Sequence, residues 1–159
     1  MKWALVLLAL LLAGCTWFVD DTYDPAFDIP ATGATTPYAV CRWVDTHVDY
    51  LDDAIHDQLE YWQSPDQTYE WGRGDCEDYA LLVLYLIHRD LGGWPELVIG
   101  RVPGGCHAWV LYDGRWYEAQ TGQDVTDLAE YVQRFTVSYG KAMWRSMNTH
   151  RSLLTGERE

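Results

Sequence analysis

The stretch Gly74-Asp75-Cys76-Glu77-Asp78-Tyr79-Ala80 leads directly into residues 81–87, whose sequence is Leu-Leu-Val-Leu-Tyr-Leu-Ile. Residues 80–87 are apolar on almost every side of a helix, so they predict a buried helix that ends at Gly92-Gly93. A cysteine in the first turn of such a helix lies at the positive end of the helix dipole, which favours its thiolate. The sequence therefore predicts a central helix with a nucleophilic thiol, Cys76, at its tip.

A small antiparallel sheet is predicted after this helix. Its strands are expected over residues 97–102, 106–112 and 115–121, and Asp113-Gly114 between the last two is a strong signal for a two-residue hairpin turn. His107 opens the strand-like sequence His-Ala-Trp-Val. A histidine on a strand beside the helix could take the proton of the Cys76 thiol, so His107 is the candidate general base.

The hairpin also indicates which residue orients the imidazole ring. A two-residue turn pairs Tyr112 with Arg115, and counting back from that pair sets His107 opposite Gln120. Glu118 lies on the diagonal and on the same face of the sheet as His107. We favour Gln120 on this register. Glu118 is the alternative, because a bulge at the turn would bring its carboxylate to the histidine.

The remaining segments are expected to cover this core. Thr36 is the predicted cap of a helix with Pro37 at its first position, and apolar residues recur at helical spacing from Val40 to Leu59. Residues 63–67 and 72–74 are expected as loop. Further predictions are a helix capped by Asp124 with Val125, Leu128, Val132 and Phe135 on one face, an edge strand over residues 136–139, and a loose end from Asn148.

The N-terminus has the pattern of an export signal. A basic start, Met1-Lys2, precedes an apolar run that is too short to cross a bilayer, and the run ends in Leu12-Ala13-Gly14-Cys15. This ending resembles the bacterial lipobox, which implies cleavage before Cys15 and lipid attachment to it; the alternative is an ordinary signal peptide. The predicted organisation is a signal peptide (1–14), a lipid-anchored tether (15–35), one domain (36–147) and a tail (148–159).

Composition limits the partners and the size of the fold. The chain has 159 residues, enough for one domain with a core, and 24 acidic against 11 basic residues give a net charge of −13. Such a charge repels phosphates, so nucleic acid is excluded as a partner. The nine Trp and eleven Tyr are expected mainly in the core, Tyr131 among them.

Two cysteines remain once Cys15 is assigned to lipid and Cys76 to chemistry. Cys41 and Cys106 could pair in an exported protein, because disulfides persist in oxidising compartments. Cys106 would point to the face of its strand opposite to His107, so such a disulfide would anchor the base without touching it. Two separate buried thiols are the alternative.

The cysteine block G-D-C-E-D-Y-A, the block H-A-W-V and the following G-R-W-Y-E-A-Q together resemble the bacterial transglutaminase-like cysteine peptidases of the papain-like superfamily. The resemblance implies an α+β fold in which a buried helix with the cysteine packs on a small antiparallel sheet with the histidine. It implies Cys76 as nucleophile and His107 as base. The third residue of the family is usually an aspartate, whereas this chain offers Gln120 or Glu118.

The resemblance also implies a function in the cell envelope of a bacterium. The expected activity is a lipid-anchored thiol hydrolase that cleaves peptide or isopeptide amide bonds through a cysteine thioester, with a protein or peptide substrate and the membrane as partners. This chemistry requires no cofactor. Two alternatives stay open: a non-catalytic module that binds peptide or peptidoglycan, and a transglutaminase that incorporates amines.

Three carboxylates flank the candidate nucleophile. Asp75, Glu77 and Asp78 would raise the pKa of the Cys76 thiol, because they oppose a second negative charge. They could simply cap the helix and complement its dipole. The resemblance implies a sharper role, because some calcium-dependent proteases of this family bind the ion through the acidic residues beside the cysteine, and calcium prefers carboxylate oxygens.

Overall fold

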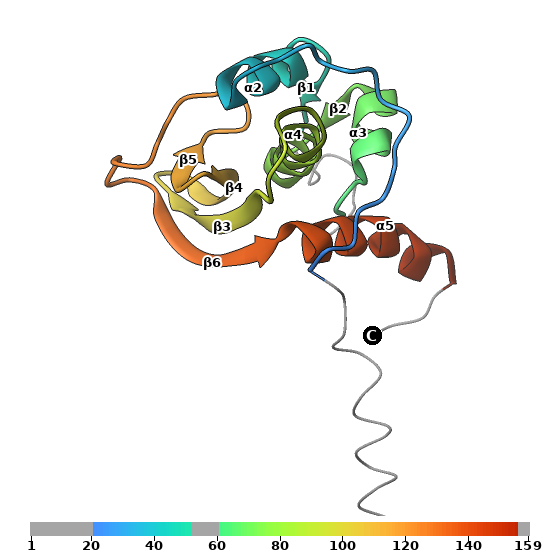
Figure 1. Ribbon diagram of the computed structural model, residues 1–159. Helices are drawn as coiled ribbons and strands as arrows, with labels where there is room; N and C mark the ends of the chain where they lie inside the picture. The colour runs from blue at the N-terminus through green and yellow to red at the C-terminus, as the bar shows by residue number, and fades with distance from the viewer. Residues whose placement is uncertain (1–20, 52–60, 156–159) are drawn as a thin grey trace, which may run out of the picture.

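The computed structural model of the protein describes residues 21–51 and 61–155. Its central element is helix α4 (Cys76–Leu91), which Figure 1 shows almost end-on. Strands β3 (Glu96–Val102) and β4 (Gly105–Tyr112) lie on one side of it, and helices α2 (Pro37–Asp45), α3 (Pro65–Trp71) and α5 (Tyr139–Thr155) surround the rest. This enclosure explains why residues 78–87 of α4 are all buried.

Helix α4 confirms the first prediction from the sequence. Asp75 is its N-cap and accepts a hydrogen bond from the backbone N–H of Asp78, and the Asp78 side chain accepts one from the N–H of Asp75. At the other end Gly92 is the C-cap, with a φ of 82° that favours glycine. The helix thus begins at Cys76 and ends at Leu91 because the local sequence supplies a cap at each end.

The main sheet is antiparallel and has the strand order β5-β4-β3-β6, where β5 is Arg115–Tyr117 and β6 is Val132–Ser138. The hairpin prediction is confirmed, since Asp113 and Gly114 both have positive φ and Tyr112 pairs with Arg115. Strand β5 is shorter than expected. Its ladder with β4 ends at Tyr117, which forms an isolated bridge with Asp124.

The predicted helix over residues 36–59 starts as expected but ends early. Thr36 caps α2 through a hydrogen bond from Ala39, and the helix stops at Asp45. Val48 follows in a turn, where its N–H donates to the carbonyl of Val44, and its side chain is buried. Asp49–Tyr50 then forms strand β1, which pairs in parallel with β2 (Arg73–Gly74). The helical spacing of the apolar residues was therefore misleading beyond residue 45. Ile55 and Leu59 lie outside the described residues.

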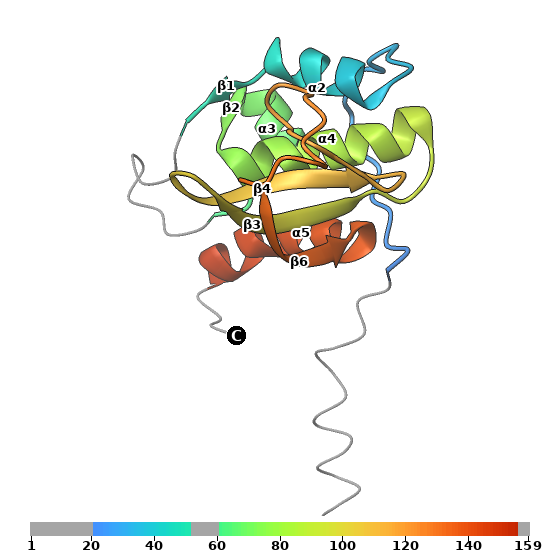
Figure 2. The same cartoon turned by 90° about the vertical axis from the view of Figure 1, so that its left-hand side faces the viewer.

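The expected loop before Cys76 contains helix α3. Ser64 is its N-cap and forms a capping box with Gln67, Pro65 occupies the first position, and Gly72 closes it with a φ of 61°. Figure 2 shows α2 and α3 on the side of α4 away from the sheet.

The predicted helix from Asp124 is wrong. Val125 and Leu128 lie in a loop and pack against Trp109, while Val132 and Phe135 belong to strand β6. The expected edge strand over residues 136–139 is confirmed in part, because β6 is an edge strand that begins earlier, at Val132. Helix α5 continues to Thr155, so the chain is not loose from Asn148.

The segment over residues 21–35 packs on the domain instead of forming a free tether. The backbone and hydroxyl of Thr32 donate to Asp90, and the Arg89 guanidinium donates to the carbonyls of Ile29 and Pro30. Two of its acidic residues are also engaged, since Asp21 pairs with Lys141 and Asp24 pairs with His88. No helix in the described ranges is long and apolar enough to cross a membrane.

Candidate active site

Cys76 occupies the first position of α4, and its side chain lies between the helix tip and strand β4. The backbone of Ala108 on β4 hydrogen-bonds to the sulfur, which favours the thiolate and lowers its pKa. Ala108 is the direct neighbour of His107. The fold therefore brings the tip of the helix to the part of the sheet that carries the histidine.

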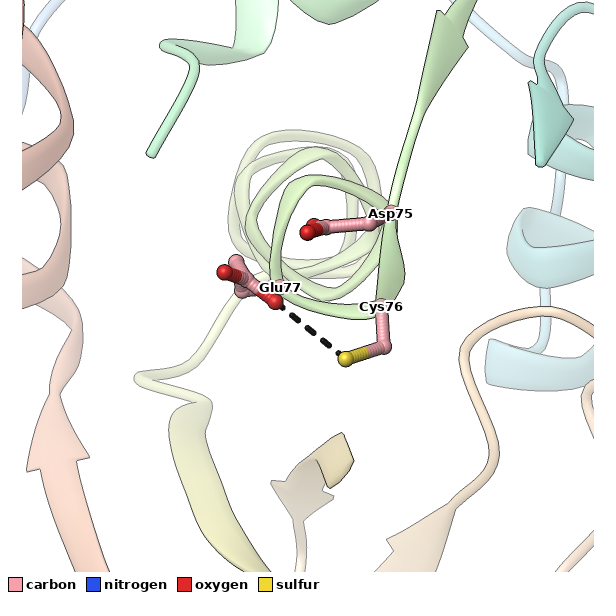
Figure 3. A group of neighbouring side chains, drawn as sticks. All are labelled: Asp75, Cys76 and Glu77. Atoms are coloured by element: carbon pink, nitrogen blue, oxygen red, sulfur yellow. Dashed lines mark hydrogen bonds between the residues drawn. The ribbon is translucent and has the colours of Figure 1, made fainter. Parts of the chain in front are cut away.

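The thiol of Cys76 is directed to Glu77 (Figure 3). Cys76 Sγ donates a hydrogen bond to Glu77 Oε2 at 3.2 Å. Burial raises the pKa of the Cys76 thiol well above its ordinary value, and the charge and hydrogen bond of Glu77 and the charge of Asp75 raise it further. These effects exceed the contribution of Ala108. Burial and the two carboxylates thus favour the protonated thiol, contrary to the expectation from the helix dipole alone.

His107 is paired with a carboxylate. Its Nε2 lies 2.7 Å from Glu118 Oε2, and both side chains are largely buried. Burial alone would raise the pKa of Glu118, but the hydrogen bond and charge of His107 and a hydrogen bond from Tyr131 hold that pKa below its ordinary value. A proton on Nε2 satisfies the carboxylate and leaves Nδ1 of the ring as the basic nitrogen.

The side chain that contacts His107 is that of Glu118. Gln120, the residue that the hairpin register favours, does not form this contact. The β4–β5 ladder ends one residue before Glu118, and a tight turn follows in which the N–H of Gly122 donates to the carbonyl of Glu118. Gln120 therefore leaves the strand. Only its backbone N–H reaches the site, where it donates to Glu118 Oε1 at 3.4 Å.

Of the three acidic residues beside Cys76, Asp75 and Glu77 are placed to bind a cation together. The ligand atoms of Asp75, Cys76 and Glu77 lie within 4.8 Å of one another. Figure 3 shows these three side chains at the tip of α4. Asp78 is not part of this group. It is fully buried, and its carboxylate accepts hydrogen bonds from the N–H groups of Gln63 and Asp75. The expected trio of ligands is therefore reduced to Asp75 and Glu77.

The other two described cysteines do not form a disulfide, which was one of the two alternatives. Cys41 and Cys106 are free thiols, the first buried in α2 and the second exposed on β4. Burial, with a smaller effect from the charge of Glu118, raises the pKa of Cys41 to about 12, so this thiol is an inert core residue. Cys15, the predicted lipid attachment site, lies outside the described residues.

Sequence reasoning missed one residue of the site. Tyr131, expected in the core, donates its hydroxyl hydrogen to Glu118 Oε2 at 2.8 Å. It lies at the end of the loop that was predicted as a helix, so its approach to Glu118 could not be found from helical spacing. Only the polar end of a tyrosine inside an apolar pattern hinted at a buried acceptor.

The comparison with solved structures identifies the fold. No protein-family model matches the sequence, and no curated protein sequence matches it. Legionella pneumophila LapG matches with a TM-score of 0.54 and 14% identity over 76% of each chain. The protein has the fold of LapG. This similarity agrees with the predicted α+β, papain-like and transglutaminase-like core, in which the helix with the cysteine packs on the sheet with the histidine.

Two further structures of LapG differ in treatment. The calcium-bound form matches with a TM-score of 0.53 and 15% identity, over 64% of this chain and 62% of LapG. The EGTA-treated form matches with a TM-score of 0.51 and 15% identity, over 64% of this chain and 61% of LapG. In these two alignments the chain spans about three fifths of the length of LapG.

Proposed function

We propose that the protein is a thiol hydrolase that cleaves peptide or isopeptide amide bonds, with Cys76 as nucleophile and His107 as general base. The observation that carries this proposal is the 2.7 Å contact between Nε2 of His107 and Oε2 of Glu118. His107 lies on β4, the strand whose backbone at Ala108 contacts Cys76. A buried carboxylate at Nε2 directs Nδ1 to act as base and stabilises the imidazolium that forms. A core histidine without function would not require a charged partner.

The proposed reaction has two balanced halves. Nδ1 of His107 takes the thiol proton, the Cys76 sulfur attacks the amide carbonyl, and the oxyanion is stabilised by N–H groups at the tip of α4. The C–N bond then breaks, and the amine leaves with the proton from His107. A water molecule next gives a proton to His107 and attacks the thioester, which releases the carboxylic acid and restores the thiol.

The contact of Cys76 with Glu77 has to be released before this reaction. LapG of Legionella pneumophila has been solved in a calcium-bound and in an EGTA-treated form. In this chain Asp75 and Glu77 supply the carboxylate oxygens that calcium prefers, whereas the sulfur of Cys76 is a poor ligand for it. We propose calcium as a regulator. When bound, it would neutralise Glu77 and compete with the thiol for its carboxylate.

Glu77→Gln is therefore expected to activate the thiol. The substitution removes a negative charge that raises the Cys76 pKa and replaces the carboxylate with a weaker, neutral amide acceptor, so more thiolate exists at a given pH. We expect iodoacetamide to alkylate Cys76 at pH 7 about tenfold faster in this variant. Calcium should accelerate alkylation of the wild type relative to EGTA, and should have little effect on Glu77→Gln. Equal alkylation rates for wild type and variant in EGTA would contradict the proposal that Glu77 keeps the Cys76 thiol protonated.

The pH dependence of Cys76 alkylation tests the proposed function. In calcium, the wild-type rate should rise with a midpoint below the ordinary thiol pKa of about 8.5, because the imidazolium of His107 stabilises the thiolate. His107→Ala should move the midpoint above that value. Since Cys41 is buried, Cys106→Ser in all variants removes the exposed competing thiol. A profile that ignores both calcium and His107 would exclude catalysis and leave a binding module.

The proposed location is the bacterial cell envelope. The apolar N-terminal run and the sequence Leu12-Ala13-Gly14-Cys15 support export and a lipid on Cys15. The substrate would accordingly be an envelope protein or peptide.

Addition of a fluorescent primary amine to the reaction distinguishes hydrolysis from transamidation, because the amine becomes covalently attached to the substrate only if it reacts with the thioester faster than water does.

A further inference from the structure

We propose that Tyr131 is a positioning residue that orients Glu118 and thereby fixes the tautomer of His107. The proposal rests on the role of His107 as base given above. Tyr131 would not touch the substrate. Its effect would pass through one carboxylate, so it can be separated experimentally from the effect of His107 itself.

The geometry around Glu118 carries the argument. Its Oε2 accepts hydrogen bonds from the hydroxyl of Tyr131 at 2.8 Å and from Nε2 of His107 at 2.7 Å. Its Oε1 accepts from the N–H of Gln120 at 3.4 Å. Glu118 is 6% exposed, so water contributes little to solvating its charge. The protein therefore supplies the hydrogen bonds of this carboxylate, and the tyrosine supplies one of the two short ones.

Tyr131 itself is held in place by packing. Its ring meets the fully buried Trp109 edge to face, with centroids 5.3 Å apart and planes at 87°. It also contacts the His107 ring, at 6.3 Å and 60°. The backbone N–H of Tyr131 donates to the carbonyl of Leu128 in the preceding turn. With the ring and the backbone fixed, the hydroxyl has a defined direction toward Glu118.

The consequence concerns which nitrogen of His107 carries the proton. A hydroxyl on Oε2 restrains rotation of the carboxylate, so the oxygen stays in the plane and at the distance that suit an Nε2–H donor. The proton then stays on Nε2, and Nδ1 remains available for Cys76. Burial and Glu118 raise the pKa of Tyr131, so its hydroxyl stays a donor while His107 gains and loses its proton.

Nitrogen-15 NMR of the full-length chain, labelled at histidine, tests this directly. His107 signals are assigned by their loss in His107→Gln. In the wild type we expect the Nε2–H tautomer to dominate. Tyr131→Phe keeps the ring and removes only the hydroxyl, and it should raise the share of the Nδ1–H tautomer several-fold. An unchanged tautomer ratio in Tyr131→Phe would overturn the proposal.

Tyr139→Phe is the matched control. Tyr139 is also a buried tyrosine whose hydroxyl donates to a carboxylate, that of Asp24 at 2.9 Å, but it belongs to another cluster. The Tyr139→Phe variant should leave the His107 signals unchanged, although it should lower the melting temperature at least as much as Tyr131→Phe does. A similar tautomer change in both variants would reveal a general loss of packing and would contradict a specific role for Tyr131.

A double-mutant cycle on Cys76 alkylation gives a second, independent readout. In calcium at pH 7, loss of a hydrogen bond to a charged group should slow alkylation in Tyr131→Phe about tenfold. If the tyrosine acts through Glu118, adding Tyr131→Phe to Glu118→Gln should cost less than about twofold more. Independent, multiplicative effects would contradict the proposal. If His107→Ala leaves alkylation unchanged, the hydrolase proposal fails, while the NMR result still decides the role of Tyr131.

Discussion

Glu118→Gln is expected to slow alkylation of Cys76 in calcium by about 100-fold or more at pH 7, with little change in stability. Glutamine has the size of glutamate, but its amide can donate a hydrogen bond to Nε2 of His107. The imidazole would then carry its proton on Nδ1, where it can no longer take one from Cys76. The substitution also removes the negative charge that stabilises the imidazolium at 2.7 Å.

Gln120→Ala is the matched control for this prediction. Gln120 lies beyond the end of β5, and its backbone N–H donates to Glu118, a contact that alanine retains. We expect its alkylation rate to stay within about twofold of the wild type. Mass spectrometry of the Cys76 peptide measures both rates. A larger effect for Gln120→Ala than for Glu118→Gln would mean that the amide orients the histidine after all.

Asp78→Ala is expected to have the largest effect on stability. The carboxylate of Asp78 is fully buried and accepts the N–H of Gln63 at 2.8 Å and the N–H of Asp75 at 3.3 Å. Alanine leaves both donors buried without this acceptor and opens space at the tip of α4. The loss should be about 3 kcal/mol, because hydrogen bonds to buried charged groups are the most costly to break. That loss lowers the melting temperature by about 10 °C.

Thermal unfolding followed by circular dichroism measures this effect. Asp78→Asn keeps one acceptor oxygen and should lose about half as much. Asp28→Ala, at an exposed aspartate, should stay within about 0.5 kcal/mol of the wild type. If Asp78→Ala melts like Asp28→Ala, the carboxylate does not stabilise the fold, and its exclusion from the cation site would have to be reconsidered.

The features that local chemistry encodes could be predicted from the sequence. Helix α4 follows from an apolar run with a cap at each end, and the hairpin follows from Asp113-Gly114, whose residues adopt positive φ. The sequence singles out Cys76 and His107 as candidates because each lies inside such an element. In these cases the information resides within a few residues of the feature, so no knowledge of distant contacts is needed.

The partner of His107 depends on where a hydrogen-bond ladder stops, which sequence alone does not determine. Counting along an ideal hairpin leads to Gln120, whereas the ladder ends at Tyr117 and the chain turns back at Gly122. The next segment misled for a related reason. Val125 and Leu128 match a helical period, but they lie in a loop and pack on the cluster around Trp109. Val132 and Phe135 belong to strand β6 of the sheet.

The packing of residues 21–35 determines how far the domain could extend from a membrane. Asp21 contacts the first turn of α5, and Asp24 pairs with His88 near the C-terminal end of α4. A lipid on Cys15 would therefore be separated from Asp21 by only the five residues 16–20, at most about 20 Å of chain. Cys76 lies at the opposite end of α4, about 18 Å from His88 along the helix axis. The folded body would then lie close to the bilayer at one end of that helix, and Cys76 would lie about a helix length away from the anchor point.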